Sequence, residues 1–277
     1  MKSFSDKVAA ITGAGSGIGR ALALQLARRG CHLALCDVNE RSLAGTVESA
    51  RLTGVKATGD HLDVADREAV HRWADQVAEE HGGVNLVFNN AGVALGSAIE
   101  GGSFEDFEWL FGINFWGVVY GTKAFLPHLR ASGEGHVVNV SSVFALISVP
   151  GQGAYNASKA AVRGFTDALR MELEMSGAPV SATTVHPGGI KTNIARNSRA
   201  DASLGKLGLD AEGGREKFDK LLVTDPDEAA KAILRAVKKN KRRVLVGRDA
   251  HLIDGMARLL PGVYQHAVKR LVRSSLG

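Results

Sequence analysis

The sequence predicts an α/β fold, with a doubly wound parallel sheet in one domain followed by a helical C-terminal extension. Six apolar stretches of strand length each precede an amphipathic stretch of helix length, one unit after another. Turns of glycine and other small residues follow the first and fourth of these strands. Because right-handed crossovers send successive helices to the two faces of one sheet, such a succession favours a parallel sheet covered on both sides.

Length and composition agree with this fold class. The 277 residues suffice for one large domain or two small ones, and a hydrophobic content of 45% with 33 glycines is ordinary for a soluble α/β protein. The two cysteines, Cys31 and Cys36, lack metal-ligand spacing, so we expect buried, reduced thiols, no metal site and a cytoplasmic location. We see neither a signal peptide nor an apolar stretch long enough to span a membrane.

The net charge of +5 is unevenly distributed. From residue 235 to the end there are eleven Lys and Arg against two Asp, a net charge of +9, which leaves −4 for residues 1–234. The basic character therefore belongs to the C-terminal part, and nucleic-acid binding does not follow from it, because a high pI by itself speaks only to solubility and non-specific attraction.

The first unit contains a strand over 7–12, the turn T-G-A-G-S-G-I-G over 12–19 and a helix over 20–29. Glycines let the backbone turn sharply and present N–H groups to a pyrophosphate, and the N-terminus of the helix adds a favourable dipole. The glycines do not match the usual G-x-G-x-x-G spacing, and a glycine turn without a ligand is the alternative. The flanking strand and helix favour a dinucleotide site.

The second strand, over 32–36, ends at Asp37. A carboxylate there can accept hydrogen bonds from both hydroxyls of an adenosine ribose and repels a 2′-phosphate, which favours NAD(H) over NADP(H). Val38 follows instead of a cation, although Arg41 lies close by. The alternative is a surface aspartate at the start of a turn.

The next units continue the pattern: a helix over 39–51, a strand over 55–62 that ends at Asp63-Val64, a helix over 67–81, and a strand over 84–88. The last of these strands ends in N-N-A-G at 89–92, whose small side chains permit close packing against a flat ligand or simply form a tight turn. A long helical pattern over 104–129 contains Asn114 among apolar residues. Asparagine is a mediocre helix residue, so we expect a local backbone kink or a bound water there.

A strand over 135–140, Ser142, a loop to 153 and a helix over 154–175 follow. In this helix Tyr155 and Lys159 are four residues apart, so their side chains lie on one face. A nearby ammonium favours the phenolate and moves a tyrosine pKa of about 10 toward neutral pH, as acid–base catalysis requires. Alone, the pair also fits a half-buried tyrosine beside a solvated lysine. Ser142 can meet the same substrate oxygen.

A sixth strand over 180–185 leads into H-P-G-G-I-K-T at 186–192. Residues 193–222, rich in Gly, Ser, Arg and Lys, are predicted to form a mobile lid. A helix over 225–240 and a last strand over 244–246 end the catalytic domain, which we place at 1–247. The extension 248–277 carries apolar residues at helical spacing over 251–276, with basic residues beside them and a break at Pro261-Gly262. It can pack on its own domain or on a neighbouring subunit, or lie on an anionic membrane.

With these motifs together, the chain resembles a short-chain dehydrogenase/reductase of about 250 residues over roughly residues 5–247. The resemblance implies a Rossmann-type fold and a homodimer or homotetramer. Tyr155 would be the acid in carbonyl reduction and the base in alcohol oxidation, and Lys159 would depress its pKa and hold the nicotinamide ribose. Ser142 would stabilise charge on the substrate oxygen. Asn114 would keep the helix open around a water that links Lys159 to solvent. Further cofactor contacts would be Gly13, Ser16, Gly17, Ile18, Gly19, Asp63, Val64, Asn90, Ala91, Gly92, Pro187, Gly188, Ile190 and Thr192.

The segment V-F-A-L-I-S-V at 143–149 should border the substrate and is almost wholly apolar. We therefore expect a hydrophobic alcohol or ketone of steroid, retinoid or long-chain type, unless these residues only pack the end of the sheet. One alternative function is an NADPH-dependent ketoreductase of the acyl-carrier-protein type, which Asp37 disfavours. Another is a non-catalytic dinucleotide-binding protein, which the presence of the serine, tyrosine and lysine disfavours.

Overall fold

The computed structural model describes residues 1–194, 197–209 and 222–276. Its centre is a seven-stranded sheet in which every neighbouring pair is parallel, in the order β3-β2-β1-β4-β6-β7-β9. The strands are β1 (Val8–Thr12), β2 (His32–Asp37), β3 (Ala57–His61), β4 (Leu86–Asn89), β6 (Gly135–Val140), β7 (Val180–Pro187) and β9 (Arg243–Val246). The predicted doubly wound sheet is confirmed, and the strand order changes direction between β1 and β4.

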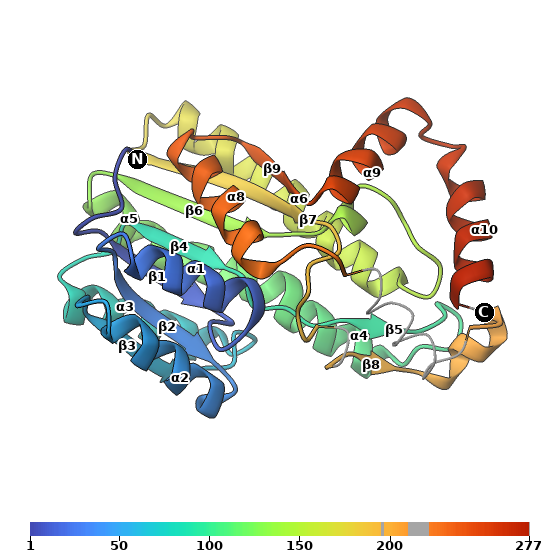
Figure 1. Cartoon of the computed structure of the whole chain (residues 1–277), viewed down its shortest axis with the longest axis horizontal. Helices are drawn as coiled ribbons and strands as arrows, with labels where there is room; N and C mark the ends of the chain where they lie inside the picture. The colour runs from blue at the N-terminus through green and yellow to red at the C-terminus, as the bar shows by residue number, and fades with distance from the viewer. Residues whose placement is uncertain (195–196, 210–221, 277) are drawn as a thin grey trace.

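Helices cover both faces of this sheet, because each face presents its own apolar cluster (Figure 1). On one face lie α1 (Gly17–Ala27), α2 (Glu40–Arg51) and α8 (Pro226–Lys238), and on the other lie α3 (Arg67–His81), α5 (Gly117–Ala131) and α6 (Gly153–Met175). The central strands β1, β4 and β6 are mostly apolar and are buried along their whole length, as a parallel sheet between two helical layers requires.

The helical pattern over 104–129 is interrupted, as the position of Asn114 predicts. The helix α4 (Phe104–Phe111) passes through one π-helical turn, η1 (Gly112–Trp116), into α5. A π turn inserts an extra residue into the ladder of backbone hydrogen bonds and is frequent at functional sites. Here it lies at the carboxyl end of β4.

Part of the predicted mobile lid, 193–222, has defined structure. Residues 195–196 and 210–221 lie outside the described residues, but β8 (Arg199–Ala200) pairs with β5 (Leu95–Gly96), and η3 (Ala202–Leu207) follows. The Arg199 guanidinium lies 3.8 Å from the Trp109 ring centroid and 2.6 Å from the Asp106 carboxylate. These contacts, which the sequence pattern did not predict, hold residues 199–207 against α4 and the segment after β4.

The extension forms two helices, α9 (Arg248–Leu259) and α10 (Tyr264–Leu276), separated at Pro261-Gly262 as expected. Their inner face packs on the same chain: Val268 and Val272 are buried against Ile147, Leu204 and Leu209. The two helices stand beyond the carboxyl ends of the strands (Figure 1). No helix among the described residues is long and apolar enough to cross a membrane.

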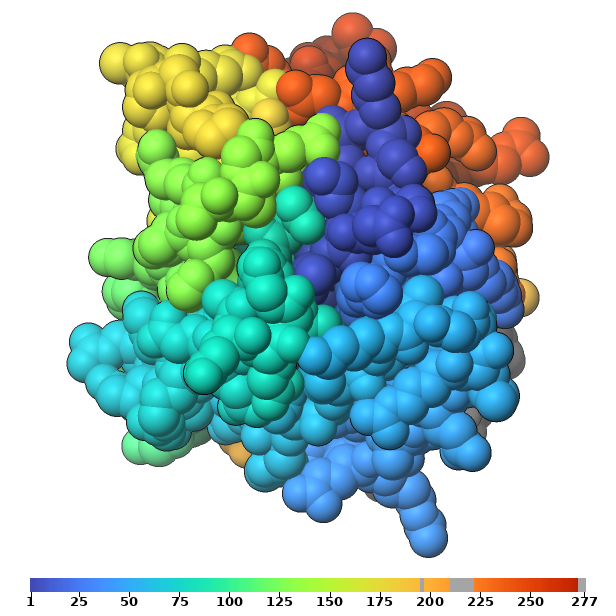
Figure 2. Space-filling view, turned by 90° about the vertical axis from the view of Figure 1, so that its left-hand side faces the viewer, coloured from blue at the N-terminus to red at the C-terminus, as the bar shows by residue number. Residues whose placement is uncertain are grey.

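The opposite end of the molecule, at the amino ends of the strands, is closed by turns and by the N-terminal segment (Figure 2). Phe4 is buried there, and Glu134 pairs with both the N-terminal ammonium and Lys7. Cys31, just before β2 at this end, and Cys36, near the carboxyl end of β2, are free and buried, and burial raises the pKa of Cys31 to about 12.

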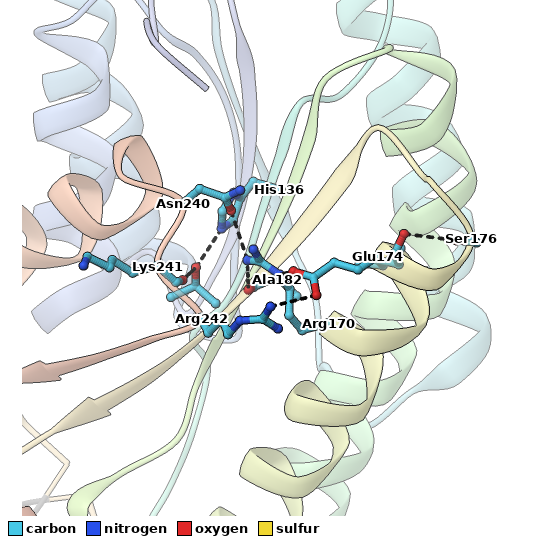
Figure 3. Close-up of polar contacts among 10 residues, drawn as sticks. His136, Arg170, Glu174, Ser176, Ala182, Asn240, Lys241 and Arg242 are labelled. Atoms are coloured by element: carbon cyan, nitrogen blue, oxygen red, sulfur yellow. Dashed lines mark hydrogen bonds and ion pairs between the residues drawn. The ribbon is translucent and has the colours of Figure 1, made fainter.

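Two buried basic side chains, the charged Arg170 and the neutral His136, join the strands at this end (Figure 3). The guanidinium of Arg170, on α6, donates to the carbonyl of Ala182 and to Asn240 Oδ1, both at 3.0 Å, and pairs with Glu174. The imidazole of His136, on β6, lies 2.8 Å from the hydroxyl of Thr183, which donates to the carbonyl of Lys241. These bonds connect α6, β6 and β7 to the turn before β9.

His136 makes the stability of the fold depend on pH. Burial, with smaller contributions from the charges of the N-terminus and Arg170, lowers the pKa of His136 from 6.5 to about 3. The unfolded chain therefore binds a proton at His136 more readily than the folded chain does. The contribution of the neutral imidazole to the free energy of unfolding is complete above about pH 6.5 and is lost as the pH falls toward 3. We expect His136 alone to cost on the order of 2 kcal/mol of unfolding free energy between pH 7 and pH 5.

The measurement is urea denaturation of the wild type and of His136→Gln at both pH values. Because His186 also has its pKa lowered to about 4 by burial, the variant should keep part of the pH dependence. An equal loss of stability in the wild type and the variant would contradict the assignment to His136.

Candidate active site

The glycine turn after β1 is shaped by close approaches that a side chain would block. Gly17 has φ +52°, which favours glycine, and a Cβ there would lie 2.9 Å from Cγ2 of Thr192. A Cβ on Gly19 would collide with the carbonyl oxygen of Gly13 and would lie 2.6 Å from Nδ2 of Asn90, which follows β4. The turn therefore brings the start of α1 against two distant segments, the ends of β4 and β7.

The N-terminus of α1 is available to an anion. The side chain of Ser16 makes no capping hydrogen bond, and the first turn, which contains Ile18, has no acidic residue. By contrast, α2 and α3 are capped by Asn39 and Asp66. Free N–H groups and the helix dipole make this terminus suited to a phosphate group.

Asp37 lies at the carboxyl end of β2, beside the glycine turn. Its Oδ2 accepts a hydrogen bond from Gly15 N and its Oδ1 accepts one from Asn39 N, both at 2.9 Å. Each carboxylate oxygen has further lone pairs, so Asp37 is held in place and can still accept from a ligand hydroxyl. Val38 is 61% exposed and faces away from the core.

The N-N-A-G segment locks the ends of β1 and β4 together. Thr12 Oγ1 accepts from the backbone N–H groups of Asn90 and Ala91, each at 3.0 Å, and the Asn90 amide donates to the carbonyls of Thr12 and Gly13. The Asn90 side chain therefore holds the glycine turn. Thr12, the first residue of the glycine motif, is a positioning residue that the sequence pattern did not single out.

Asp63 and Val64 follow β3, farther along the same edge of the sheet. Asp63 Oδ1 accepts from Ala65 N at 2.9 Å, and Val64 is buried against Gly117 at the start of α5. Asp63 and Val64 thus lie at the carboxyl edge of the sheet, next to the ends of β2 and β3.

Asn114 is fully buried and pairs with the backbone of Val93 as a neighbouring strand would. Its Oδ1 accepts from Val93 N at 2.8 Å, and its Nδ2 donates to Val93 O at 2.9 Å. A Cβ on Gly92 would lie 3.2 Å from Asn114 Oδ1 and 3.3 Å from Lys159 Nζ. The π turn, the N-N-A-G segment and α6 therefore meet at this point.

Ser142, Tyr155 and Lys159 also come together. Lys159 is 3% exposed, and its ammonium donates to Val140 O at 3.2 Å and lies 5.7 Å from the Tyr155 ring centroid. Ser142, at the end of β6, is within hydrogen-bonding reach of the Tyr155 phenol. The carbonyl of Ser142 is in turn contacted by His186 Nδ1 at 3.0 Å. A phenol, an ammonium and a hydroxyl thus face one small region.

The pKa of Tyr155 is shifted in the direction opposite to that expected. Burial raises it from 10.0 to about 12, and the hydrogen bond from Ser142 opposes this only in part. Burial also lowers the pKa of Lys159 from 10.5 to about 8. Loss of hydration dominates, and no contribution from the Lys159 charge, 5.7 Å from the ring centroid, offsets it. The protein alone holds Tyr155 as a neutral acid.

The segment after β7 is organised by a residue of the C-terminal extension. Pro187 ends β7, and a Cβ on Gly188 would collide with the carboxylate of Asp249, the second residue of α9. Asp249 Oδ2 accepts from Gly189 N at 2.6 Å. Ile190 is buried, which leaves Thr192 against Gly17 as described above. Asp249 was missed because no spacing in the sequence relates it to residues 187–192.

The apolar segment 143–149 lies between the site and the extension. The ring of Phe144 meets the Tyr155 ring edge-on, with 6.0 Å between centroids. Ile147 is buried against Val268 and Val272, and Ser148 N donates to the Tyr264 hydroxyl at 3.1 Å. One end of this apolar cluster therefore adjoins the phenol, and α10 forms its outer wall.

A dinucleotide fits these residues. Side chains at Gly13, Gly17 and Gly19 would collide with neighbouring residues, so the turn stays free of them. The N-terminus of α1 has N–H donors that no side chain caps, and Asp37 provides an acceptor at the end of β2. These features follow one edge of the sheet across the point where the strand order reverses, which is where open α/β sheets bind ligands. The arrangement supports transfer of a hydride between a cofactor and an alcohol or carbonyl near Tyr155.

Comparison with known proteins agrees with this geometry. The model of the short chain dehydrogenase family matches residues 7–203. The chain is 52% identical over 270 residues to "Putative oxidoreductase SadH" of Mycobacterium tuberculosis, covering 97% of this chain and 96% of that protein. It is 36% identical over 248 residues to the C alpha-dehydrogenase of a Sphingobium strain, covering 87% and 80%.

Two solved structures with bound cofactor are also similar. A short-chain dehydrogenase/reductase from Burkholderia phymatum in complex with NAD has a TM-score of 0.83 and 31% identity, over 100% of this chain and 99% of that one. An alcohol dehydrogenase from Thermococcus sibiricus complexed with 5-hydroxy-NADP has a TM-score of 0.72 and 29% identity, over 87% and 95%. The chain therefore belongs to the short-chain dehydrogenase/reductase family and is an NAD(P)-dependent oxidoreductase.

Proposed function

We propose that this enzyme interconverts a primary or secondary alcohol and its carbonyl compound, uses NAD(H), and acts on a hydrophobic substrate. The observation that carries the proposal is the convergence of Ser142, Tyr155 and Lys159 beside the apolar segment 143–149. Bound at the glycine turn, the nicotinamide cofactor would supply or accept the hydride.

The roles of the side chains follow from their surroundings. In carbonyl reduction Tyr155, held neutral by burial, donates a proton to the substrate oxygen, and in alcohol oxidation it takes the proton back. Ser142 stabilises charge on that oxygen. Lys159, largely charged at neutral pH, favours the phenolate when the proton is taken and is placed to bind ribose hydroxyls. Asn114 positions the backbone around Lys159.

We assign cofactor binding to residues at the carboxyl ends of β1–β4 and β7, together with Tyr155 and Lys159 on α6. The pyrophosphate would lie on the turn containing Gly13 and the start of α1, and the adenosine along Asp37 and Asp63. The full set is Gly13, Ser16, Gly17, Ile18, Gly19, Asp37, Asp63, Val64, Asn90, Ala91, Gly92, Tyr155, Lys159, Pro187, Gly188, Ile190 and Thr192.

Preference for NAD(H) rests on Asp37. Both of its oxygens are fixed by backbone N–H groups, so the carboxylate stays at the end of β2, where a 2′-phosphate would meet its charge. The similar structures contain NAD in one case and an NADP derivative in another, so the family by itself leaves the preference open.

Further parts of the proposal concern the surroundings of the site. We place the catalytic domain at 1–247, with residues 197–209 covering the substrate side through the β5–β8 pair, and the extension at 248–277. We also propose a cytoplasmic homodimer or homotetramer. The exposed side chain of Trp116, stacked on Tyr120 at 5.8 Å on the outer side of α5, is suited to such an interface.

Cofactor preference is tested by fluorescence titration with NADH and NADPH. We expect wild-type enzyme to bind NADH at least tenfold more tightly, because a 2′-phosphate beside a fixed carboxylate costs more than about 1.4 kcal/mol. Asp37→Ala should level or reverse the preference. Asn39→Ala, which removes a nearby helix cap but keeps the carboxylate, is the control. Tighter binding of NADPH by the wild type would refute the preference and favour the ketoreductase alternative.

Substrate class is tested with a panel of lipophilic secondary alcohols and small polyols. We expect kcat/KM to be at least tenfold higher for the lipophilic alcohols, since each well-buried apolar group contributes about 1.5–3 kcal/mol. Phe144→Ala should reduce this ratio, while Phe104→Ala, at an exposed position on α4, should not. Faster turnover of polyols by the wild type would overturn the assignment.

A further inference from the structure

The outer face of α9 and α10 carries large apolar side chains that the domain does not cover. Leu252 is 76% exposed, Leu259 81%, Leu260 47% and Val263 60%. Three of these residues lie at the end of α9 or in the turn that follows it, residues 259–263, which we call the hairpin tip. The tip stands away from the body of the molecule (Figure 1). Exposed apolar side chains gathered at one projecting turn mark an interaction site.

The charges along α9 and α10 have one sign on the outer side and the other on the side toward the domain. The basic residues of the two helices are all exposed: Arg248, Arg258, Lys269, Arg270 and Arg273. The two carboxylates, Asp249 and Asp254, are turned toward the domain. Asp249 holds the backbone of Gly189, and Asp254 pairs with Arg243 at 2.6 Å and Arg258 at 3.0 Å. The outward side of the hairpin therefore combines apolar and cationic groups.

This combination fits an anionic lipid surface better than a second copy of the chain. A two-fold dimer through this face would set the same cationic patch against itself, and like charges across an interface are unfavourable. A bilayer with anionic headgroups instead accepts Lys and Arg at its surface while apolar side chains enter the acyl boundary. Because the inner side of the hairpin is already packed on Ile147 and Leu204, only its outer side is available.

We propose that the hairpin tip docks the enzyme on anionic membranes, with Leu259, Leu260 and Val263 entering the headgroup region and Arg270 and Arg273 contacting lipid phosphates. The inference goes beyond the proposed catalytic function and does not depend on it. Since α10 also forms the outer wall of the apolar cluster beside Tyr155, docking brings the substrate side of the site close to the lipid phase.

The test is sedimentation of the full-length protein with vesicles of phosphatidylcholine alone or mixed with phosphatidylglycerol. We expect binding to the mixed vesicles at low salt, weak binding to phosphatidylcholine alone, and release at high salt, because salt screens surface charge. Failure to bind mixed vesicles, or equal binding to both, overturns the proposal.

Variants then separate the apolar and cationic contributions. The triple variant L259S/L260S/V263S should lower the partition coefficient at least tenfold for each side chain that enters the bilayer. R270Q/R273Q should lower it about fivefold per arginine. Leu52→Ser, at an 84% exposed leucine at the end of α2, is the matched control and should leave binding unchanged.

Two further measurements distinguish membrane docking from misfolding of the variants and from a protein–protein interface at the tip. Turnover of a water-soluble alcohol should be unchanged in all variants, which shows that they fold. Size-exclusion chromatography should give one oligomeric state for wild type and variants. If the triple variant changes the oligomeric state and leaves vesicle binding intact, the tip is a protein interface and the membrane proposal is wrong.

Discussion

Burial of the Lys159 ammonium is the constraint on which the site depends. The side chain is 3% exposed, and the one hydrogen-bond partner described for its ammonium is the carbonyl of Val140. Taking a cation out of water is costly, and the lowered pKa of Lys159 expresses that cost. The surroundings must therefore be polar and fixed, and they are built from Asn114, the backbone near Gly92 and the end of β6.

Those surroundings explain several departures from regular structure. The π turn turns Asn114 inward, where its amide replaces a missing strand neighbour for Val93. Thr12 and Asn90 fasten the ends of β1 and β4 to each other, which fixes the glycine turn against the N-N-A-G segment. The side chains of Thr12, Asn90 and Asn114 thus make hydrogen bonds to backbone groups near the buried cation that would otherwise be unpaired.

Much of this arrangement could be predicted from the sequence. Apolar runs located the strands to within a few residues, and the parallel order then brought the residues after each strand to one edge. The Tyr155 and Lys159 spacing placed both on one face of α6. The distant contacts could not be predicted. Asp249 meets Gly189 across 60 residues of chain, and no local pattern encodes that approach.

The C-terminal extension could likewise be predicted from the sequence only in part. Its helical periodicity predicted two amphipathic segments and the break between them, but the partners of the inner face, Ile147 and Leu204, depend on the tertiary fold. The direction of the Tyr155 pKa was also missed. Sequence spacing shows that a cation is near the phenol, whereas the balance between its charge and the loss of hydration depends on burial and orientation.

We propose that Tyr155 and Lys159 act as one acid–base unit, and the pH dependence of kcat in both directions tests this. Oxidation needs the phenolate and should rise with pH, reduction needs the phenol and should fall, and one apparent pKa should describe both. Lys159→Gln, which removes the cation, should shift this pKa upward, and Tyr155→Phe should lose nearly all activity while still binding NADH. A flat profile, or an apparent pKa unchanged in Lys159→Gln, would contradict the account.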